Sequence, residues 1–141
     1  VSSAGFLTED LPAEPFAVDV MAARGLDLSQ HRSRRCTPEL LADADLVLAM
    51  TREHVRWAYE LWADSFARTF TLKELVRRGG EVGPVSGGLD AWLAEIDEER
   101  ESAQLLGQSR HDDIADPMGR PLRRFRACAD EIEATSAVKD E

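Results

Sequence analysis

Few side chains in this sequence combine a reactive type with a spacing that supports chemistry. One arrangement that lets a cysteine attack phosphorus is Cys-x5-Arg, in which the amides between the two residues curl around one phosphate and the guanidinium clamps it. Cys36 is followed six positions later by Ala42, and Cys128 is followed by Ala134. Neither cysteine therefore has the Cys-x5-Arg spacing. Cys36 is a candidate exposed thiol, and Cys128, close to an apolar helix face, is expected to pack inertly.

Other familiar motifs for phosphate or metal chemistry are also missing from these 141 residues. The sequence has no Gly-x4-Gly-Lys-Ser/Thr and no Gly-x-Gly-x-x-Gly segment, so neither kind of nucleotide-binding loop is encoded. The three histidines, His31, His54 and His111, lack metal-ligand spacing with one another or with either cysteine. We therefore predict no metal site and no cofactor.

The composition is that of a globular protein with an acidic surface. A length of 141 residues fits one domain spanning 1–141, and 43% hydrophobic and 31% charged residues are ordinary values. The formal net charge of −10 argues against nucleic acid or an anionic membrane as a partner. The longest apolar run, 46–50, is too short to cross a bilayer. Two distant cysteines and no secretory segment predict a cytoplasmic location.

The elements that must position any site alternate between strands and helices. Short strands are predicted at 1–4, 45–50 and 68–72, the second of them buried on both faces because its apolar residues do not alternate with polar ones. Helices are predicted from Pro15 to Gly25, over 38–43 after the N-cap Thr37, from Thr51 to about 66, from 73 to Gly79-Gly80, over 89–96 and over 122–132. This alternation predicts an α/β fold with a parallel sheet.

Four stretches, in this order, resemble the low-molecular-weight protein tyrosine phosphatase family. They are Val1–Phe6, Gly25–Arg34, Ala44–His54 and Asp113–Gly119. The resemblance implies a three-layer α/β sandwich with a short parallel sheet in the strand order 2-1-3-4. The segment from about 78 to 108 is longer than is usual for the family.

The resemblance also implies which residues carry out catalysis. Asp116, beside Pro117, corresponds to the general acid that protonates the leaving group and later activates water. Met118 stands where the family commonly has an aromatic residue that walls the substrate ring, and Phe6 and Leu7 are candidates for the opposite wall. Two simpler interpretations remain open: the Asp-Pro pair starts a turn before the last helix, and Phe6 is a core residue.

In the family, the first strand and the Cys-x5-Arg loop precede the Ser-Ala-Gly segment, here Ser3-Ala4-Gly5. We therefore expect the domain to be N-terminally incomplete, with a gap in the sheet between 1–4 and 45–50. An omitted upstream segment, a partner strand or a rearranged core would fill it. Because an unpaired strand edge invites pairing with another molecule, self-association of this chain is expected.

Three functions remain open at this point. The first is a phosphatase that hydrolyses protein phosphotyrosine or small aryl phosphates through a cysteinyl-phosphate intermediate, provided that the upstream loop is present. The second is a catalytically dead relative that binds or regulates, and the third is an arsenate reductase, which needs additional resolving cysteines. Arginines at 120, 123, 124 and 126 either attract a phosphorylated substrate or form the solvated face of the last helix.

Overall fold

Two short parallel strands, β1 (Val47–Ala49) and β2 (Thr69–Thr71), form the sheet in the part of the chain that the structure describes. The structure is a computed structural model that describes residues 1–105 and 109–137. Val47 is in register with Thr69 and Ala49 with Thr71. The predicted α/β class and the parallel pairing of the strands expected at 45–50 and 68–72 are confirmed.

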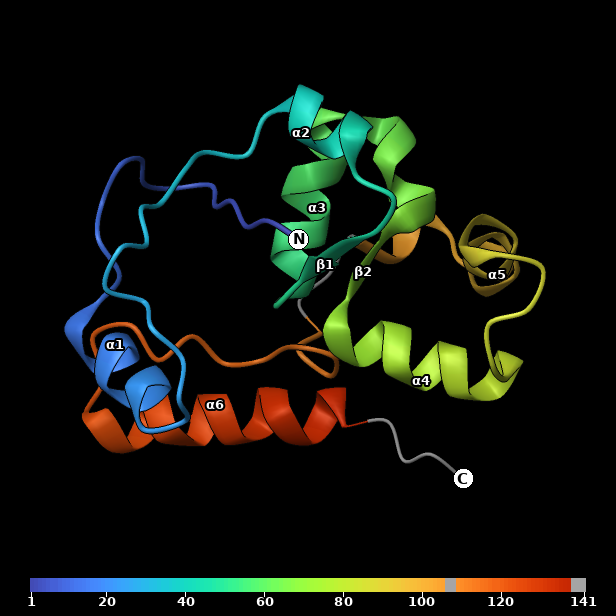
Figure 1. Cartoon of the computed structure of the whole chain (residues 1–141). Coiled ribbons are helices and arrows are strands. Elements are labelled where there is room, and N and C mark those ends of the chain that lie inside the picture. Colours follow the sequence, from blue (N-terminus) through green and yellow to red (C-terminus); the bar gives the residue numbers. More distant parts are fainter. Residues whose placement is uncertain (106–108, 138–141) are drawn as a thin grey trace. The chain divides into compact units, whose positions relative to one another are not determined.

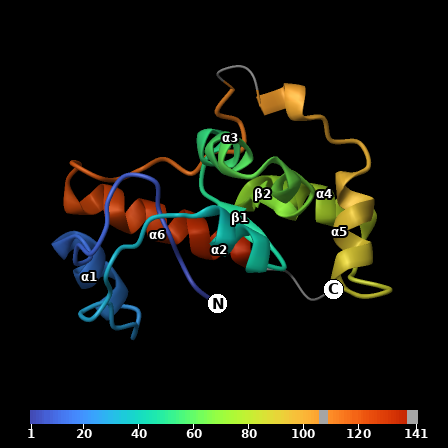
Figure 2. The ribbon, with the colours of Figure 1, turned by 90° about the horizontal axis from the view of Figure 1, so that it is seen from above.

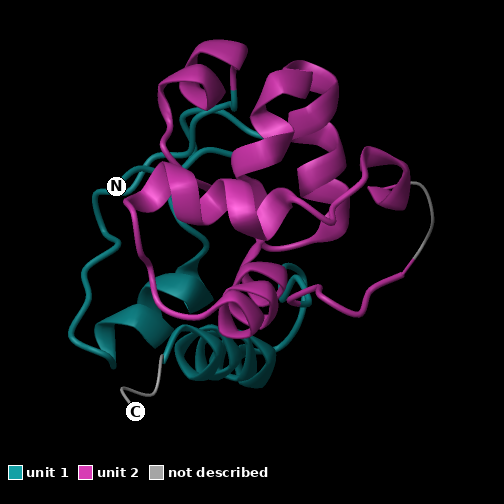
Figure 3. Cartoon of the chain, turned by 90° about the vertical axis from the view of Figure 1, so that its right-hand side faces the viewer, with its two compact units in different colours: residues 1–36, 115–141 teal, residues 37–114 magenta. Residues whose placement is uncertain are grey.

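The chain divides into two compact units (Figure 3), residues 1–36 with 115–141 and residues 37–114. The second unit holds both strands. Its helical elements are α2 (Pro38–Asp43), α3 (Arg52–Leu61), the 3-10 helix η1 (Ala63–Arg68), α4 (Leu72–Val82), α5 (Leu89–Asp97) and the 3-10 helix η2 (Ser102–Leu105).

Threonine hydroxyls start the three helices that follow an extended segment in the second unit. Thr37, Thr51 and Thr71 each accept a hydrogen bond from the backbone N–H three residues later. Each of these helices also has a glutamate in its first turn, where a negative charge complements the helix dipole. The predicted helix starts after Thr37 (α2) and after Thr51 (α3) are both confirmed.

The core of the second unit lies between β2, α4 and α5, which the views of Figures 1 and 2 show side by side. Phe70 is fully buried, and Leu93 and Ile96 are nearly so. Partly buried apolar side chains complete this cluster: Leu46, Leu75, Val82 and Trp92. The apolar stripe predicted for 89–96 therefore faces this core.

Two predicted helix ends are wrong. Helix α4 does not stop at Gly79-Gly80 but continues to Val82, and Gly83, with φ +99°, ends it. Gly79 is required for packing rather than termination, because a Cβ there would lie 2.9 Å from the Trp92 ring. Helix α3 ends at Leu61 rather than near 66, because Ser65 donates both its backbone N–H and its hydroxyl to the Trp62 carbonyl and so favours a 3-10 turn.

The first unit pairs α1 (Pro15–Ala22) with α6 (Leu122–Ser136), the helices predicted at 15–25 and 122–132. The rings of Phe16 and Phe125 meet edge to face, 5.6 Å apart. Arg24 forms ion pairs with Asp130 and Glu133 on α6. This unit is therefore held by a helix pair, not by a sheet.

The prediction of a strand at 1–4 is wrong. Residues 1–4 are exposed and form no strand; only Gly5 makes a parallel bridge, with Arg35. The Gly5 N–H donates to the Arg34 carbonyl at 2.8 Å, and the Cys36 N–H donates to the Gly5 carbonyl at 2.7 Å. Four exposed residues, two of them serines, bury too little apolar surface to hold a longer ladder.

Burial of the strand around 46–50 on both faces is also contradicted, since Leu48 is 45% exposed. Among the described residues, the strand has a paired neighbour on one side only, β2, so its other edge is unpaired. The self-association expected from such an edge remains a prediction.

Candidate functional site

The Asp116 loop is a pair of consecutive turns that leads into α6. The Asp116 side chain accepts a hydrogen bond through Oδ1 from the Met118 N–H at 2.9 Å, and the Arg120 N–H donates to the Pro117 carbonyl at 2.9 Å. Gly119 has φ +74°, a conformation that glycine adopts without strain. These turns hold the Asp116 carboxylate at an exposed position, where it can exchange protons with a bound molecule.

The segment that precedes this loop is fixed within the second unit. Ile114 is 2% exposed, and its N–H donates to the Met50 carbonyl at 2.8 Å. The Asp113 carboxylate accepts from the Arg52 N–H at 2.8 Å, at the start of α3. Within the second unit, Asp113 and Ile114 therefore dock where β1 ends and α3 begins.

The four side chains predicted to form the site all belong to the first unit. The turn links Asp116 to Met118, a residue that is 62% exposed. Leu7 is 76% exposed and Phe6 half-buried, both on the segment that follows Gly5. The structure thus places the candidate general acid, Asp116, and one candidate substrate-contacting residue, Met118, in the same turn. The roles of all four residues remain predictions.

The local environment raises the pKa of both cysteine thiols. Burial raises the pKa of the Cys128 thiol, and the negative charges of Glu131 and Asp116 raise it further. Burial also raises the pKa of Cys36, and the nearby Arg34 offsets this only in part. Because the thiolate is the nucleophilic form, neither cysteine is poised for attack. The spacing argument from the sequence led to the same conclusion.

We expect both thiols to react slowly with iodoacetamide at pH 7 and faster as the pH rises through their raised pKa values. The reason is that the reactive thiolate forms only above those values. Alkylation of Cys36→Ser and Cys128→Ser variants, followed by mass spectrometry, measures each thiol separately. A rate at pH 7 above that of free cysteine in either variant would contradict this prediction.

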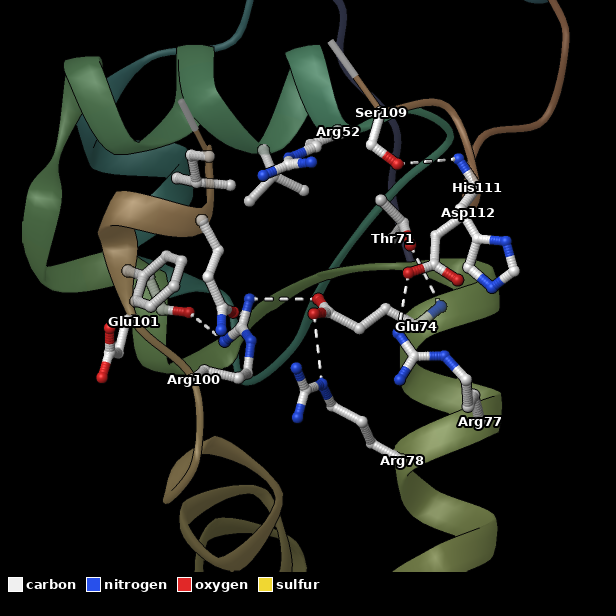
Figure 4. Close-up of a pocket in the computed structure, with 14 residues that line it drawn as sticks. Arg52, Thr71, Glu74, Arg77, Arg78, Arg100, Glu101, Ser109, His111 and Asp112 are labelled. Carbon is white, nitrogen blue, oxygen red and sulfur yellow. Dashed lines mark hydrogen bonds and ion pairs between the residues drawn. The ribbon is translucent and has the colours of Figure 1, made fainter. Parts of the chain in front are cut away.

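A cavity of about 290 Å³ lies within the second unit, and Figure 4 shows charged side chains of α4 and of residues 100–101 and 112 in its lining. The charges pair with one another. Arg77 contacts Asp112 at 2.7 Å, and Glu74 accepts from both Arg78 and Arg100 at 3.2 Å. None of the side chains predicted from the sequence as site residues lines this cavity.

Arg100 is the centre of this network, with a side chain that is 2% exposed. Its guanidinium donates to the carbonyls of Phe66 and Thr69 at 2.8 and 2.6 Å. It also lies over the rings of Phe66 and Phe70, with its central carbon 4.2 and 4.0 Å from their centroids. These contacts give Arg100 a structural role, joining η1, β2 and α4.

Sequence analysis missed this network because residues 95–101 resemble a solvated acidic run. The signal was a single arginine among five carboxylates at 95, 97, 98, 99 and 101, directly after an apolar helical stripe. Among residues 1–105 and 109–137, no group of three or more histidine, cysteine or acidic side chains could hold a metal ion. Over the same residues, no helix is long and apolar enough to cross a membrane.

Comparison with known proteins places the chain in a family. A sequence profile of the low molecular weight phosphotyrosine protein phosphatases matches residues 1–83. The chain belongs to this family. The parallel β1–β2 pair and the Asp-Pro loop ahead of the last helix agree with the resemblance of the four stretches.

Relatives fall under two descriptions. The probable low molecular weight protein-tyrosine-phosphatase EpsP of Ralstonia nicotianae is 51% identical over 98 residues, which cover 60% of this chain and 68% of the relative. The protein-arginine-phosphatase of Bacillus subtilis is 34% identical over 111 residues, covering 77% of this chain and 73% of that protein.

Solved structures give the same two descriptions. The arginine phosphatase YwlE from Geobacillus stearothermophilus matches with a TM-score of 0.67 and 30% identity, over 95% of this chain and 67% of that one. A low molecular weight protein tyrosine phosphatase from T. tengcongensis matches with a TM-score of 0.67 and 29% identity, over 95% and 71%. The chain thus spans roughly two thirds to three quarters of the length of these relatives.

Proposed function

We propose that a domain containing these residues and a Cys-x5-Arg loop ahead of them hydrolyses phosphorylated protein residues, in the first place phosphotyrosine. Asp116 is its general acid, and Met118, Phe6 and Leu7 contact the substrate. The observation that carries the proposal is the exposed Asp116 carboxylate. The Met118 N–H holds it at 2.9 Å, in a turn that leads into α6.

The reaction follows in two displacements. A thiolate sulfur attacks phosphorus, the S–P bond forms, and the bond from phosphorus to the leaving atom breaks as Asp116 gives its proton to that atom. Water then attacks phosphorus, its proton passes to the Asp116 carboxylate, and the S–P bond breaks to release phosphate. The exposure of Asp116 suits both steps, because the carboxyl must meet first the leaving group and then water.

The 141 residues by themselves should not hydrolyse p-nitrophenyl phosphate. They contain no cysteine with an arginine six positions later, and the thiols that they do contain have raised pKa values, so that no group is present to attack phosphorus. Release of p-nitrophenol above a buffer blank, if vanadate abolished it, would refute this. The same assay on a protein that includes the upstream coding region tests the proposed function directly.

Phosphoarginine is the second candidate substrate. What supports it is the extent of similarity: the protein-arginine-phosphatase of Geobacillus stearothermophilus is 31% identical over residues that cover 94% of this chain. Met118, where an aromatic wall would favour a phenyl ring, is compatible with a more flexible aliphatic substrate. Peptides of identical sequence, carrying phosphotyrosine or phosphoarginine at one position, would distinguish the two by their kcat/KM values.

Two further alternatives predict different results. A catalytically dead relative would bind phosphorylated peptides without turnover and would have no Cys-x5-Arg in the upstream coding region. An arsenate reductase would need resolving thiols, a role that the raised pKa values of Cys36 and Cys128 do not favour. Sequencing the coding region upstream of Val1 is the first experiment, because it separates a catalytic domain from a dead one.

A further inference from the structure

Four arginines occupy seven consecutive positions directly after the Asp116 loop. Arg120 lies in the loop, and Arg123, Arg124 and Arg126 lie in the first turns of α6; all four side chains are exposed. Among the described residues, none of these guanidinium groups forms an ion pair or a side-chain hydrogen bond. In a chain of net charge −10, this arginine surface is a concentrated region of unneutralised positive charge.

The geometry of α6 directs these arginines away from the packed side of the helix. Successive residues are rotated by about 100° around a helix, so Arg123 lies opposite the buried Phe125, and Arg124 and Arg126 lie on its two flanks. Phe125 faces α1, where its ring meets that of Phe16. The arginine surface therefore needs no rearrangement to meet a partner.

The charge distribution along α6 is unfavourable for the helix itself. The arginines occupy its N-terminal end, and its carboxylates, at 130, 131 and 133, follow near the C-terminal end. Cations near an N-terminus oppose the helix dipole, and like charges three or four residues apart repel each other. A charge pattern that costs helix stability and has no intramolecular partner is expected where function requires it.

We propose that the arginine surface binds acidic side chains next to the phosphorylated residue, so that the enzyme prefers protein substrates with aspartate or glutamate flanking the phosphate. This inference rests on the proposed function. Two observations tie the surface to the site: the turn that closes with the Arg120 N–H on the Pro117 carbonyl, and the four-residue separation of Arg120 from Asp116. Arginine suits this role because its planar guanidinium pairs with carboxylates in two parallel hydrogen bonds.

The test compares two phosphopeptides on the protein that includes the upstream coding region. One carries three glutamates beside the phosphorylated residue, and in the other these are glutamines. The ratio of their kcat/KM values is measured for the natural protein, for R123Q/R124Q/R126Q and for R123K/R124K/R126K. We expect the natural protein to favour the acidic peptide about tenfold, the glutamine variant to lose this preference, and the lysine variant to keep most of it.

Further measurements distinguish the arginine proposal from its alternatives. The preference of the natural protein should shrink as salt rises from 50 to 500 mM, since exposed charge pairs are screened. A protein that turns over p-nitrophenyl phosphate but shows equal ratios in all three forms would overturn the arginine proposal and leave the proposed function standing. Absence of any turnover would refute the proposed function instead. If the substitutions reduced binding to phosphatidylserine vesicles and left the peptide ratio alone, the surface would be a membrane contact and the proposal would be wrong.

Discussion

Replacing Asp116 with alanine, in a domain that carries the Cys-x5-Arg loop, is expected to lower kcat about 10²–10⁴-fold. The loss arises because a phenolate or amine that leaves without a proton is a poor leaving group. The loop itself should survive, since Pro117 and Gly119 still shape the turn when only the hydrogen bond from the Met118 N–H is lost. Steady-state kinetics with a phosphopeptide measure the effect.

The dependence on the leaving group distinguishes acid catalysis from a structural role. Substrates whose leaving group departs without protonation should lose much less than substrates with a poor leaving group. Asp19→Asn, the removal of another exposed carboxylate in the same unit, serves as the control for net charge and should leave kcat close to that of the natural protein. Equal losses on good and poor leaving groups would show that Asp116 only shapes the loop.

Replacing Arg100 with methionine is expected to lower the free energy of unfolding by about 3–5 kcal/mol. The substitution keeps a long side chain against Phe66 and Phe70 but removes the positive charge. Glu74 then keeps only its pair with Arg78, Asp97 loses its ion pair with Arg100, and the carbonyls of Phe66 and Thr69 lose a buried donor. Buried polar groups left unpaired are costly, because water no longer solvates them. Urea unfolding followed by circular dichroism measures the loss.

Arg78→Met is the matched control, because Arg78 contacts the same Glu74 from one helical turn away. Its pair with Glu74 is a single i,i+4 contact between side chains that are each 17% exposed, and it should contribute no more than about 1 kcal/mol. Similar losses of stability for the two variants would mean that burial and stacking of Arg100 add nothing to its ion pairs. The network would then stabilise the protein no more than exposed surface ion pairs do.

Local signals in the sequence were enough to predict most of the elements. Thr37 and Thr51 predicted helix starts, since a threonine hydroxyl can satisfy a free N–H of the first turn whatever surrounds it. Pro15 did the same for α1, because its fixed φ suits the first turn of a helix. The family was also predicted from local sequence, because four short stretches that resemble it occur in the family's order.

Long-range contacts decided what these signals could not. Gly79-Gly80 continues as helix because Trp92, thirteen residues after Gly79, packs against the space where a side chain would be. The sequence of residues 1–4 predicted a strand, but a strand exists only when a neighbour supplies its hydrogen bonds. In the structure, this segment has one bridge, at Gly5. Backbone pairing and close packing depend on the partner, and the partner is distant in sequence.

The properties of the candidate reactive groups also divide into those that the sequence determined and those that the tertiary structure decided. The sequence by itself determined that no Cys-x5-Arg loop lies within these residues, that Asp116 precedes a proline and that four arginines follow it. Residue type and spacing are properties of the sequence alone. Only the tertiary structure decided that burial raises the pKa of both thiols, that Arg100 is enclosed rather than solvated, and that the four arginines have no partner among the described residues. Solvation and electrostatic energies depend on what surrounds a charge, and folding alone determines those surroundings.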